Sequence, residues 1–474
     1  MSGRDKGGFM KMTFFAACCC VAAALAGDTL PGAAVHGYLD WDNFRLWKAD
    51  YKGTPFKGDW FSSIIGGLAV DADLGKGLSS RVAFEGKTYR PFPEVQNKQE
   101  SRLGKFAFYI HEARLLYQYG DAGRFPFEIE AGYFHYDYNR NQRNLGEYLF
   151  RSQIYPGNLY TDFDFPEEKL LGIRIGNRPF GGFHHDLLMT GEYRFYPKSD
   201  FSLSYLCDYG FKGIFNVGGG VDFHHLIPVK PALVTPKSDE NTYLEIPSQT
   251  WYDSAGTAHV IVAPLRGFIN TLRENDSISY LQMGTFSREL YPQISRTATH
   301  FSYQGVKLMG MISFDPKPLL GSPAVFGAQD LKIYGEAAIL GIKDYPFYYD
   351  NILERIPVMA GVNLPCFHIF DVCAVEAEYY GSRLPNDGQT ALRSGVPHPG
   401  SSNFSAGAWD PAKFSGDDVK WSVYLRKEFG HGLGITAQAA CDHLRMPDES
   451  DNTFETIMKN PDDFWAIVRL TSRF

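Results

Sequence analysis

The stretch FWAIVRLTSRF, Phe464–Phe474, determines how the rest of this chain is interpreted. Its residues alternate at a period of two. The more apolar face consists of Phe464, Ala466, Val468, Leu470, Ser472 and Phe474. The opposite face consists of Trp465, Ile467, Arg469, Thr471 and Arg473. About ten alternating residues are the length of strand that crosses a hydrocarbon layer at a tilt. The stretch predicts a membrane-crossing β-strand, although an ordinary sheet strand fits the same pattern.

The same alternation recurs upstream. Val419–Phe429 and Leu433–Cys441 flank the turn Gly430-His431-Gly432, and Phe106–Tyr119 and Phe125–Tyr138 flank another short turn. Such pairs are typical of β-hairpins. We expect about sixteen strands, within a range of about fourteen to eighteen, and almost no amphipathic helix. Strands of soluble sandwiches average about five residues, and no repeat of propeller length is present. The pattern therefore favours a single antiparallel β-barrel.

Long polar connections alternate with these tight turns. The long connections cover residues 139–168, 226–300, 381–417 and 445–461. Short turns at one end and long loops at the other are typical of outer-membrane barrels. The longest, 226–300, contains five prolines that keep it from forming regular strands. We expect it to fold inward and narrow the lumen; the alternative is an external loop without contact to the pore.

The composition excludes some classes of protein and identifies an export signal. The 474-residue chain has a formal net charge of −8, which gives no reason to expect a nucleic-acid partner. Aromatic residues make up 15%, which suits the aromatic girdles of a membrane barrel. Met12–Ala26 is apolar, follows Lys11 and ends in Ala-Leu-Ala. We predict a signal peptide at 1–26 and a barrel at 27–474; the apolar run is short for a transmembrane anchor, and Phe15–Cys18 only roughly imitates a lipobox.

The closing strand resembles the terminal strand of bacterial outer-membrane β-barrel proteins, which ends on a Phe with apolar residues at alternate upstream positions. Ser472 departs from that pattern. The resemblance implies a porin-like barrel with long extracellular loops that lets small polar solutes diffuse passively. It also implies contact with outer-membrane lipids and recognition of Phe474 by the barrel-assembly machinery as an assembly signal. Many porins form homotrimers, and the sequence leaves that question open. The alternative function is a non-conducting surface scaffold or adhesin that acts through its loops.

If the apolar faces meet lipid, the polar faces line the lumen. The candidate pore-lining residues are Arg114, Glu128, Glu130, Arg174, Glu192, Arg194, Glu336, Glu376, Glu378, Arg426 and Arg469. Both signs of charge are present in similar number. They form either a wall of paired charges that stabilises the barrel or a pore that favours polar, weakly charged solutes.

Other constellations give little reason to expect catalysis or a cofactor. His184-His185 and His224-His225 are candidate metal ligands, but adjacent residues of a strand point to opposite faces. No G-x-S-x-G motif is present, and the acidic loop 447–452 lacks the spacing of a calcium loop. Cys207, Cys366, Cys373 and Cys441 are dispersed and have no metal-ligand spacing. Cys207 and Cys441 lie on the apolar faces of alternating runs and are interpreted as small apolar residues. We expect no enzymatic activity, no metal and no cofactor.

Overall fold

The computed structural model describes most of the chain downstream of the predicted signal peptide. The described residues are 32–51, 54–56, 59–89, 105–120, 127–151, 169–193, 199–227, 249–252, 258–261, 304–321, 324–342, 351–381, 418–441, 444–447, 453–456 and 463–474. The predicted signal peptide and Arg194 lie outside these residues, as does most of the connection 226–300.

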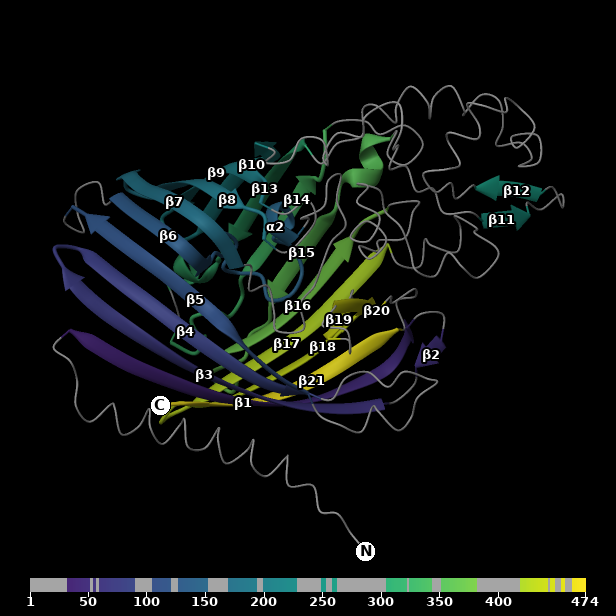
Figure 1. The fold of residues 1–474 in the computed structure, drawn as a ribbon, viewed down its shortest axis with the longest axis horizontal. Coiled ribbons are helices and arrows are strands. Elements are labelled where there is room, and N and C mark those ends of the chain that lie inside the picture. The colour runs from purple at the N-terminus through teal and green to yellow at the C-terminus, as the bar shows by residue number, and fades with distance from the viewer. Residues whose placement is uncertain are drawn as a thin grey trace, which may run out of the picture.

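Antiparallel strands make up almost all of the described chain (Figure 1). The first half of the main sheet consists of β1 (Ala33–Tyr51), β2 (Thr54–Phe56), β3 (Asp59–Gly75), β4 (Leu78–Tyr89), β5 (Lys105–Tyr119), β6 (Phe127–His135), β7 (Lys169–Phe180), β8 (Phe183–Gly191) and β9 (Phe201–Phe211). The second half consists of β10 (Phe215–Ile227), β13 (Gly305–Phe314), β14 (Ile333–Ile339), β15 (Val358–Asn363), β16 (Val372–Tyr379), β17 (Val419–Phe429), β18 (Leu433–Cys441) and β21 (Phe464–Arg473).

Smaller elements lie outside this sheet. They are the hairpins β11 (Gln249–Tyr252) with β12 (Ala258–Ile261) and β19 (Leu444–Pro447) with β20 (Thr453–Thr456), the helix α2 (Tyr148–Arg151), and the 3₁₀ turns Lys317–Leu320 and Ile352–Arg355. No helix among the described residues is long and apolar enough to span a membrane.

The main sheet closes on itself. Each strand pairs with its successor, and β21 pairs with both β18 and β1, from Tyr38 opposite Arg473 to Lys48 opposite Phe464. Of the seventeen strands in the sheet, only the short β2 stands outside the ring, which therefore has sixteen. Closure leaves no free edge in the ring. The prediction of one antiparallel barrel of about sixteen strands is confirmed, and Phe464–Phe474 is its closing strand.

The two ends of the barrel differ. At one end lie both termini of the ring and tight turns such as 76–77, 181–182 and 430–432. Gly432 has φ of +74°, and a Cβ there would lie 2.2 Å from the carbonyl oxygen of Arg473, so glycine allows this turn to pack on the closing strand. The strands that flank the four long connections, such as β6 and β7 or β16 and β17, meet these connections at the opposite end. The predicted asymmetry between turns and loops is therefore present.

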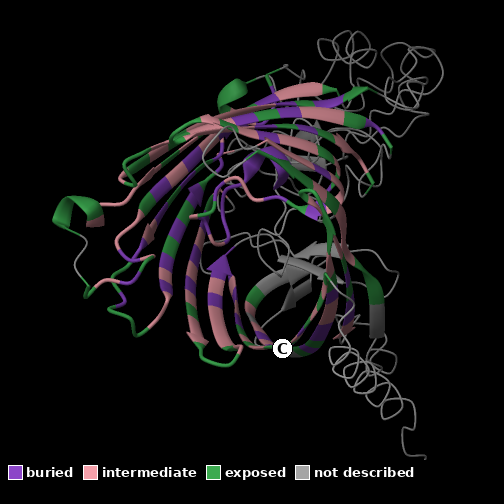
Figure 2. Ribbon diagram, turned by 90° about the vertical axis from the view of Figure 1, so that its left-hand side faces the viewer, coloured by how far each residue is buried: buried purple, intermediate pink, exposed green. Residues whose placement is uncertain are grey.

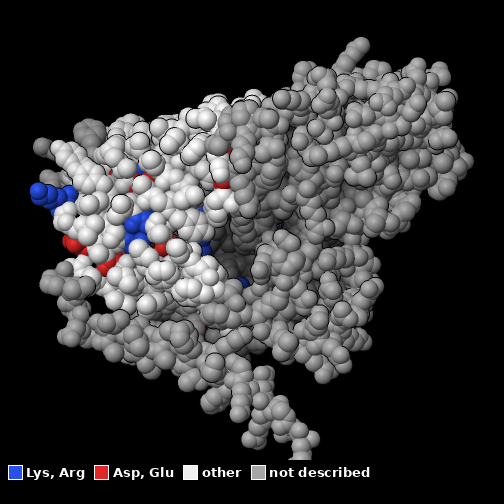
Figure 3. Space-filling model, in the orientation of Figure 1, with Lys and Arg blue, Asp and Glu red and all other residues white. Residues whose placement is uncertain are grey.

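Burial alternates along the strands (Figure 2), with polar groups on the buried side. In β16 the inward side chains of Glu376 and Glu378 are 1% and 3% exposed, whereas the outward Val375 and Tyr379 are 36% and 57% exposed. Uncharged side chains also cover most of the described face in Figure 3. Soluble proteins bury apolar residues and expose charged ones. This inverted pattern is that of a barrel with a polar lumen and an apolar exterior.

Candidate functional site: a segment inside the barrel

Residues 136–151, which follow β6, pack against the inner wall of the barrel. Leu145, Tyr148 and Leu149 are at most 1% exposed and form an apolar cluster with wall residues that include Leu188 and Met309. We call residues 136–151 the inward segment. The sequence predicts only a long polar loop at residues 139–168 and predicts that 226–300 folds inward. Few residues of 226–300 are described, and its proposed role in narrowing the lumen stays a prediction.

Glu376, on β16, holds the first part of the inward segment. Its carboxylate accepts hydrogen bonds from the backbone N–H groups of Arg143, Asn144 and Leu145 at 2.5, 2.9 and 3.0 Å. The Tyr334 hydroxyl donates a fourth bond at 2.8 Å. Three consecutive backbone donors aimed at one carboxylate form an anion-binding concavity.

Glu336, on β14, holds the next turn of the inward segment. It accepts from the backbone N–H groups of Glu147 and Tyr148 at 3.1 and 2.9 Å, where α2 begins. The Tyr138 hydroxyl and the Asn139 amide donate to it at 2.7 and 3.1 Å. A carboxylate at the first N–H groups of a helix satisfies donors that have no partner within the helix. Hydrogen bonds to a charged group contribute about 1.5–3 kcal/mol each.

The remaining contacts tighten the inward segment. The Tyr148 hydroxyl donates to Glu378 at 2.9 Å, and Arg151 lies 3.8 Å from the same carboxylate. Within the segment, Glu147 accepts from the backbone N–H groups of Tyr138 and Asn139 at 3.1 and 2.8 Å. Its φ of +57° places Glu147 in the left-handed region. These bonds fold the segment into a closed loop.

Burial perturbs the titration of groups in the inward segment. It raises the pKa of the Tyr138 hydroxyl, as does the nearby Glu336 carboxylate. The pKa of Tyr148 is likewise raised by burial and by Glu378. For Glu147, burial raises the pKa well above its usual range, and the neighbouring Asp137 adds to the effect. A buried Glu147 next to other carboxylates therefore favours its protonated form.

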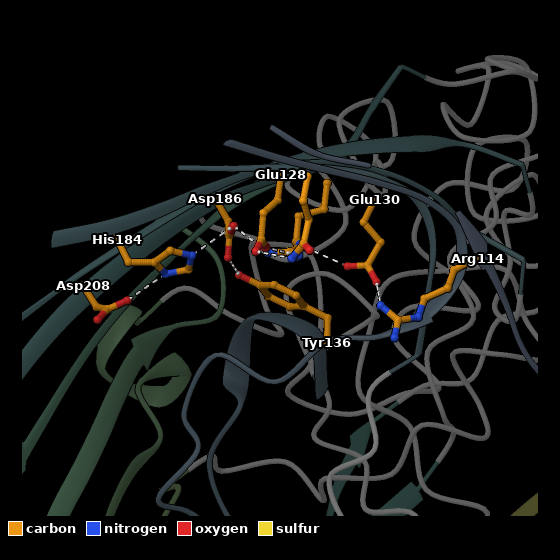
Figure 4. A network of polar contacts seen from close by, with 9 residues as sticks. Arg114, Glu128, Glu130, Tyr136, His184, Asp186 and Asp208 are labelled. Atoms are coloured by element: carbon orange, nitrogen blue, oxygen red, sulfur yellow. Dashed lines mark hydrogen bonds and ion pairs between the residues drawn. The ribbon is translucent and has the colours of Figure 1, made fainter. Parts of the chain in front are cut away.

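The opposite part of the inner wall is arranged differently (Figure 4). On β5 to β7, Arg114 pairs with Glu112 and Glu130 at 2.6 and 2.5 Å, and Arg174 pairs with Glu130 and Glu128 at 2.9 and 3.0 Å. Arg174 is thus placed between two carboxylates of the neighbouring strand.

This chain of ion pairs extends across neighbouring strands. Arg174 also pairs with Asp186 on β8 at 3.1 Å, and the ring of His184 lies 3.4 Å from Asp186 and 3.1 Å from Asp208 on β9. In the other direction Arg81, on β4, joins Glu112 at 2.7 Å. Each charge therefore has an opposite neighbour on the next strand.

A cavity of about 1080 Å³ separates this wall from the inward segment, towards the short-turn end. Its lining includes Arg114, Glu128, Glu130, Arg174 and Asp186 from the wall. Tyr136 of the inward segment joins the two sides, because its hydroxyl donates to Asp186 at 2.8 Å (Figure 4). The space is large enough for a small solute and offers both signs of charge.

The structure thus divides the candidate pore-lining residues. Arg114, Glu128, Glu130 and Arg174 line the cavity, whereas Glu336, Glu376 and Glu378 lie covered by the inward segment. The others are distributed elsewhere. Arg469 pairs with Asp42 at 2.7 Å, Arg426 lies 3.7 Å from Glu428, and Glu192 lines a small pocket with His224, while Arg194 is outside the described residues. Alternation at a period of two predicts on which face of the sheet a side chain lies. It does not predict whether another segment of the chain covers that side chain.

The two histidine doublets behave differently. His184 points into the lumen, and His185 stacks against Phe183 at 5.6 Å between ring centroids. The expectation of opposite faces is wrong for His224 and His225, which are 6% and 1% exposed with ring centroids 4.2 Å apart. The register shifts between Phe223 and Ile227, and His225 has φ of +48°, so a β-bulge turns both rings inward. No group of three or more His, Cys, Asp or Glu suited to a metal ion occurs among the described residues.

Among known proteins, only solved structures are found to be similar to this chain. No protein-family model matches the sequence, and no curated protein matches it. The chain is similar to OprB of Pseudomonas putida at 9% identity, covering 94% of each chain with a TM-score of 0.48. It is similar to OmpF of Salmonella typhi at 10% identity, covering 93% of this chain and 97% of that one with a TM-score of 0.43. A mutant of the Rhodopseudomonas blastica porin has 8% identity and a TM-score of 0.38, with coverage of 93% and 100%. The closed antiparallel barrel of sixteen strands therefore rests on the strand pairing of this chain itself.

Proposed function

We propose that this protein is an outer-membrane channel for passive diffusion of small polar solutes, narrowed by the inward segment. The observation that carries the proposal is the cavity between the inward segment and the charged wall. It lies inside a closed barrel whose exterior is apolar. A ring of sixteen strands is wide enough to leave an aqueous lumen, whereas eight strands are filled by their own side chains.

The charges favour solutes that are polar but carry little net charge. Arginine, glutamate and aspartate side chains alternate along the cavity wall, so a strongly charged solute meets repulsion as well as attraction. Hydroxyl-bearing neutral solutes can exchange hydrogen bonds with both kinds of group.

Export and assembly belong to the same proposal. Residues 1–26 act as the cleaved signal, and the barrel-assembly machinery recognises the closing strand. Phe474 exchanges backbone hydrogen bonds with Gly37 at 2.7 and 2.9 Å, while its side chain stays 56% exposed. Phe474→Ala is therefore expected to lower the outer-membrane level without destabilising barrels that have already folded. Equal outer-membrane levels of variant and wild type would contradict this assembly role. A homotrimer is compatible with the proposal but is not part of it.

Conductance of the purified barrel in a planar bilayer tests the function directly. A channel gives discrete current steps, and liposomes that contain it swell in solutions of small neutral polyols. A non-conducting surface scaffold or adhesin gives neither response. A heat-modifiable, folded preparation without current steps would therefore favour that alternative. The test does not depend on knowing the natural solute.

A further inference from the structure

We infer that a second cavity inside the barrel binds small zwitterions, solutes that carry both an ammonium and a carboxylate group as α-amino acids do. The inference rests on the proposed channel and names a class of solute for it. The second cavity has a volume of about 520 Å³ and is lined by residues of β1, β3, β4 and β5 at the short-turn end. Arg114 lines this cavity and also the one beside the inward segment, so the two are neighbours.

Short side chains leave the space open. The lining residues with no side chain larger than that of serine are Gly32, Ala33, Ala34, Ala72, Ser79 and Ser80. The carbonyl of Gly32 accepts from the backbone N–H of Asp73 at 2.7 Å, and Gly32 has φ of +88°. A Cβ at Gly32 would lie 3.1 Å from the carbonyl oxygen of Asp73, so glycine allows this close approach. Ser79 is the register partner of Asp73 on β4. The space is therefore bounded by small residues and by the charged side chains beside them.

Two arginines supply hydrogen-bond donors on one side of the second cavity. Arg81 and Arg114 are register partners on β4 and β5, an arrangement that like charges disfavour. Glu112 offsets the repulsion, because its carboxylate lies 2.7 and 2.6 Å from the two Nε atoms. Nη1 of Arg81 donates to Asp71, and Nη1 of Arg114 donates to Glu130. Neither Nη2 donates a hydrogen bond to any described residue. Paired guanidinium groups with unused N–H donors suit a carboxylate.

Asp73 supplies an anion on the other side. It is exposed, and its Oδ1 accepts from the backbone N–H of Gly75 at 2.8 Å. Of the charged side chains that line the second cavity, only Asp73 has no ion-pair partner among the described residues. Asp71, two positions earlier on β3, pairs with Arg81 at 3.0 Å and with His36 at 3.3 Å. Residues two apart on a strand are separated by about 7 Å, a distance that one small solute can bridge.

These charges favour a zwitterion over a simple ion. A simple anion meets the carboxylates of Asp71, Asp73 and Glu112, and a simple cation meets the two arginines. A solute with both groups places its carboxylate on the arginine N–H groups and its ammonium on Asp73. It neutralises the unpaired aspartate without leaving a charge of its own unpaired.

Saturation-transfer NMR on the purified, folded barrel in detergent micelles at neutral pH tests this preference with three probes. L-Alanine carries both charges. Lactate has a hydroxyl in place of the ammonium, and alaninamide has an uncharged amide in place of the carboxylate. Because a hydrogen bond to a charged group is lost in each analogue, we expect half-saturation by alanine at a concentration about tenfold lower than by either analogue. Equal half-saturation by all three probes would refute the inference.

Three variants locate the binding. Asp73→Asn keeps an acceptor for the Gly75 N–H but loses the charge, so alanine should bind about tenfold more weakly and lactate no more weakly than before. Ser79→Leu fills the space and should weaken all three probes. Glu428→Gln removes a charge at the same end of the barrel, on β17, and should bind alanine like wild type. Unchanged alanine binding in Asp73→Asn and Ser79→Leu would overturn the assignment.

The binding measurement does not depend on conduction, so the inference and the channel fail separately. Preferential alanine binding by a barrel without current steps supports the site and refutes only the channel. Current steps without a preference for alanine refute only the site. In a conducting barrel, alanine should also reduce the current to a saturating level, and Asp73→Asn should shift that saturation to higher concentration.

Discussion

On β14 and β16 the inward carboxylates meet backbone N–H groups, whereas on β5 to β8 they meet arginine and histidine side chains. Glu376 receives three consecutive backbone donors, and Glu130 lies between Arg114 and Arg174. Both carboxylates are almost fully buried, at 1% and 4% exposed. The difference is what each one holds. Glu376 attaches the inward segment to the wall, whereas Glu130 stabilises the wall itself beside the cavity.

Removing the loop anchors should produce the largest effect. Glu336→Ala combined with Glu376→Ala removes the acceptors of five backbone N–H groups, and hydrogen bonds to charged groups contribute about 1.5–3 kcal/mol each. The inward segment should leave the wall, and single-channel conductance should rise several-fold. Glu112→Ala is the matched control, because that carboxylate pairs with Arg81 and Arg114. Equal conductance of the double variant and wild type would mean that the segment does not constrict the pore.

Breaking the charged wall should instead reduce stability. Arg174→Met leaves Glu128, Glu130 and Asp186 without their shared cation, and losing one member of a buried ion pair costs about 3–5 kcal/mol. The midpoint of urea unfolding should fall, and cation selectivity of the pore should increase. Arg426→Met is the control: its side chain is 44% exposed and lies 3.7 Å from Glu428, so its loss should cost about 0–1 kcal/mol. Similar shifts of the urea-unfolding midpoint in both variants would contradict the conclusion that Arg174 stabilises the barrel more than Arg426 does.

The carboxylates on β14 and β16 and those on β5 to β8 are both assigned to the inner face of the barrel, which faces water and not lipid. Val468 is 42% exposed on the outer face of the closing strand, and a lipid-facing arginine near the midplane costs about 2–4 kcal/mol. Val468→Arg should therefore lower the folding yield in lipid vesicles. Asn216→Arg places the same side chain in the cavity and should fold almost as well as wild type. If both variants fold equally well, the inside and outside of the barrel have been assigned incorrectly.

The smallest effect concerns pH and the inward segment. Glu147 has a raised pKa in the folded segment, so the folded form binds a proton more tightly than the released one. Its stabilising contribution is fully present below the usual glutamate pKa and is lost as pH rises through the raised value. Conductance fluctuations should therefore increase at higher pH. Glu147→Gln, which stays neutral, should flatten this dependence, and a persistent pH dependence would assign the effect to another group.

Much of the architecture follows from local patterns. Alternation at a period of two predicted the hairpin formed by β17 and β18 and the closing strand Phe464–Phe474, because strand pleating requires that alternation whatever the partner strand is. Glycine-containing turns such as Gly430-His431-Gly432 predicted which end of the barrel carries the short turns. The same alternation gave Arg114 and Arg174 as inward residues, and they line the cavity. These features depend on neighbours in the sequence.

The position of the inward segment depends on contacts between residues far apart in the chain. Nothing local distinguishes residues 136–151 from other polar and aromatic loops, because the acceptors for its N–H groups are Glu336 and Glu376, about two hundred positions away. The bulge that turns His224 and His225 inward also depends on pairing with β9. The sequence by itself determined the strands, their faces and the closure of the ring. Only the tertiary structure decided which loop enters the lumen and which carboxylates it covers, because backbone donors have no sequence signature and meet their acceptors only when the barrel closes.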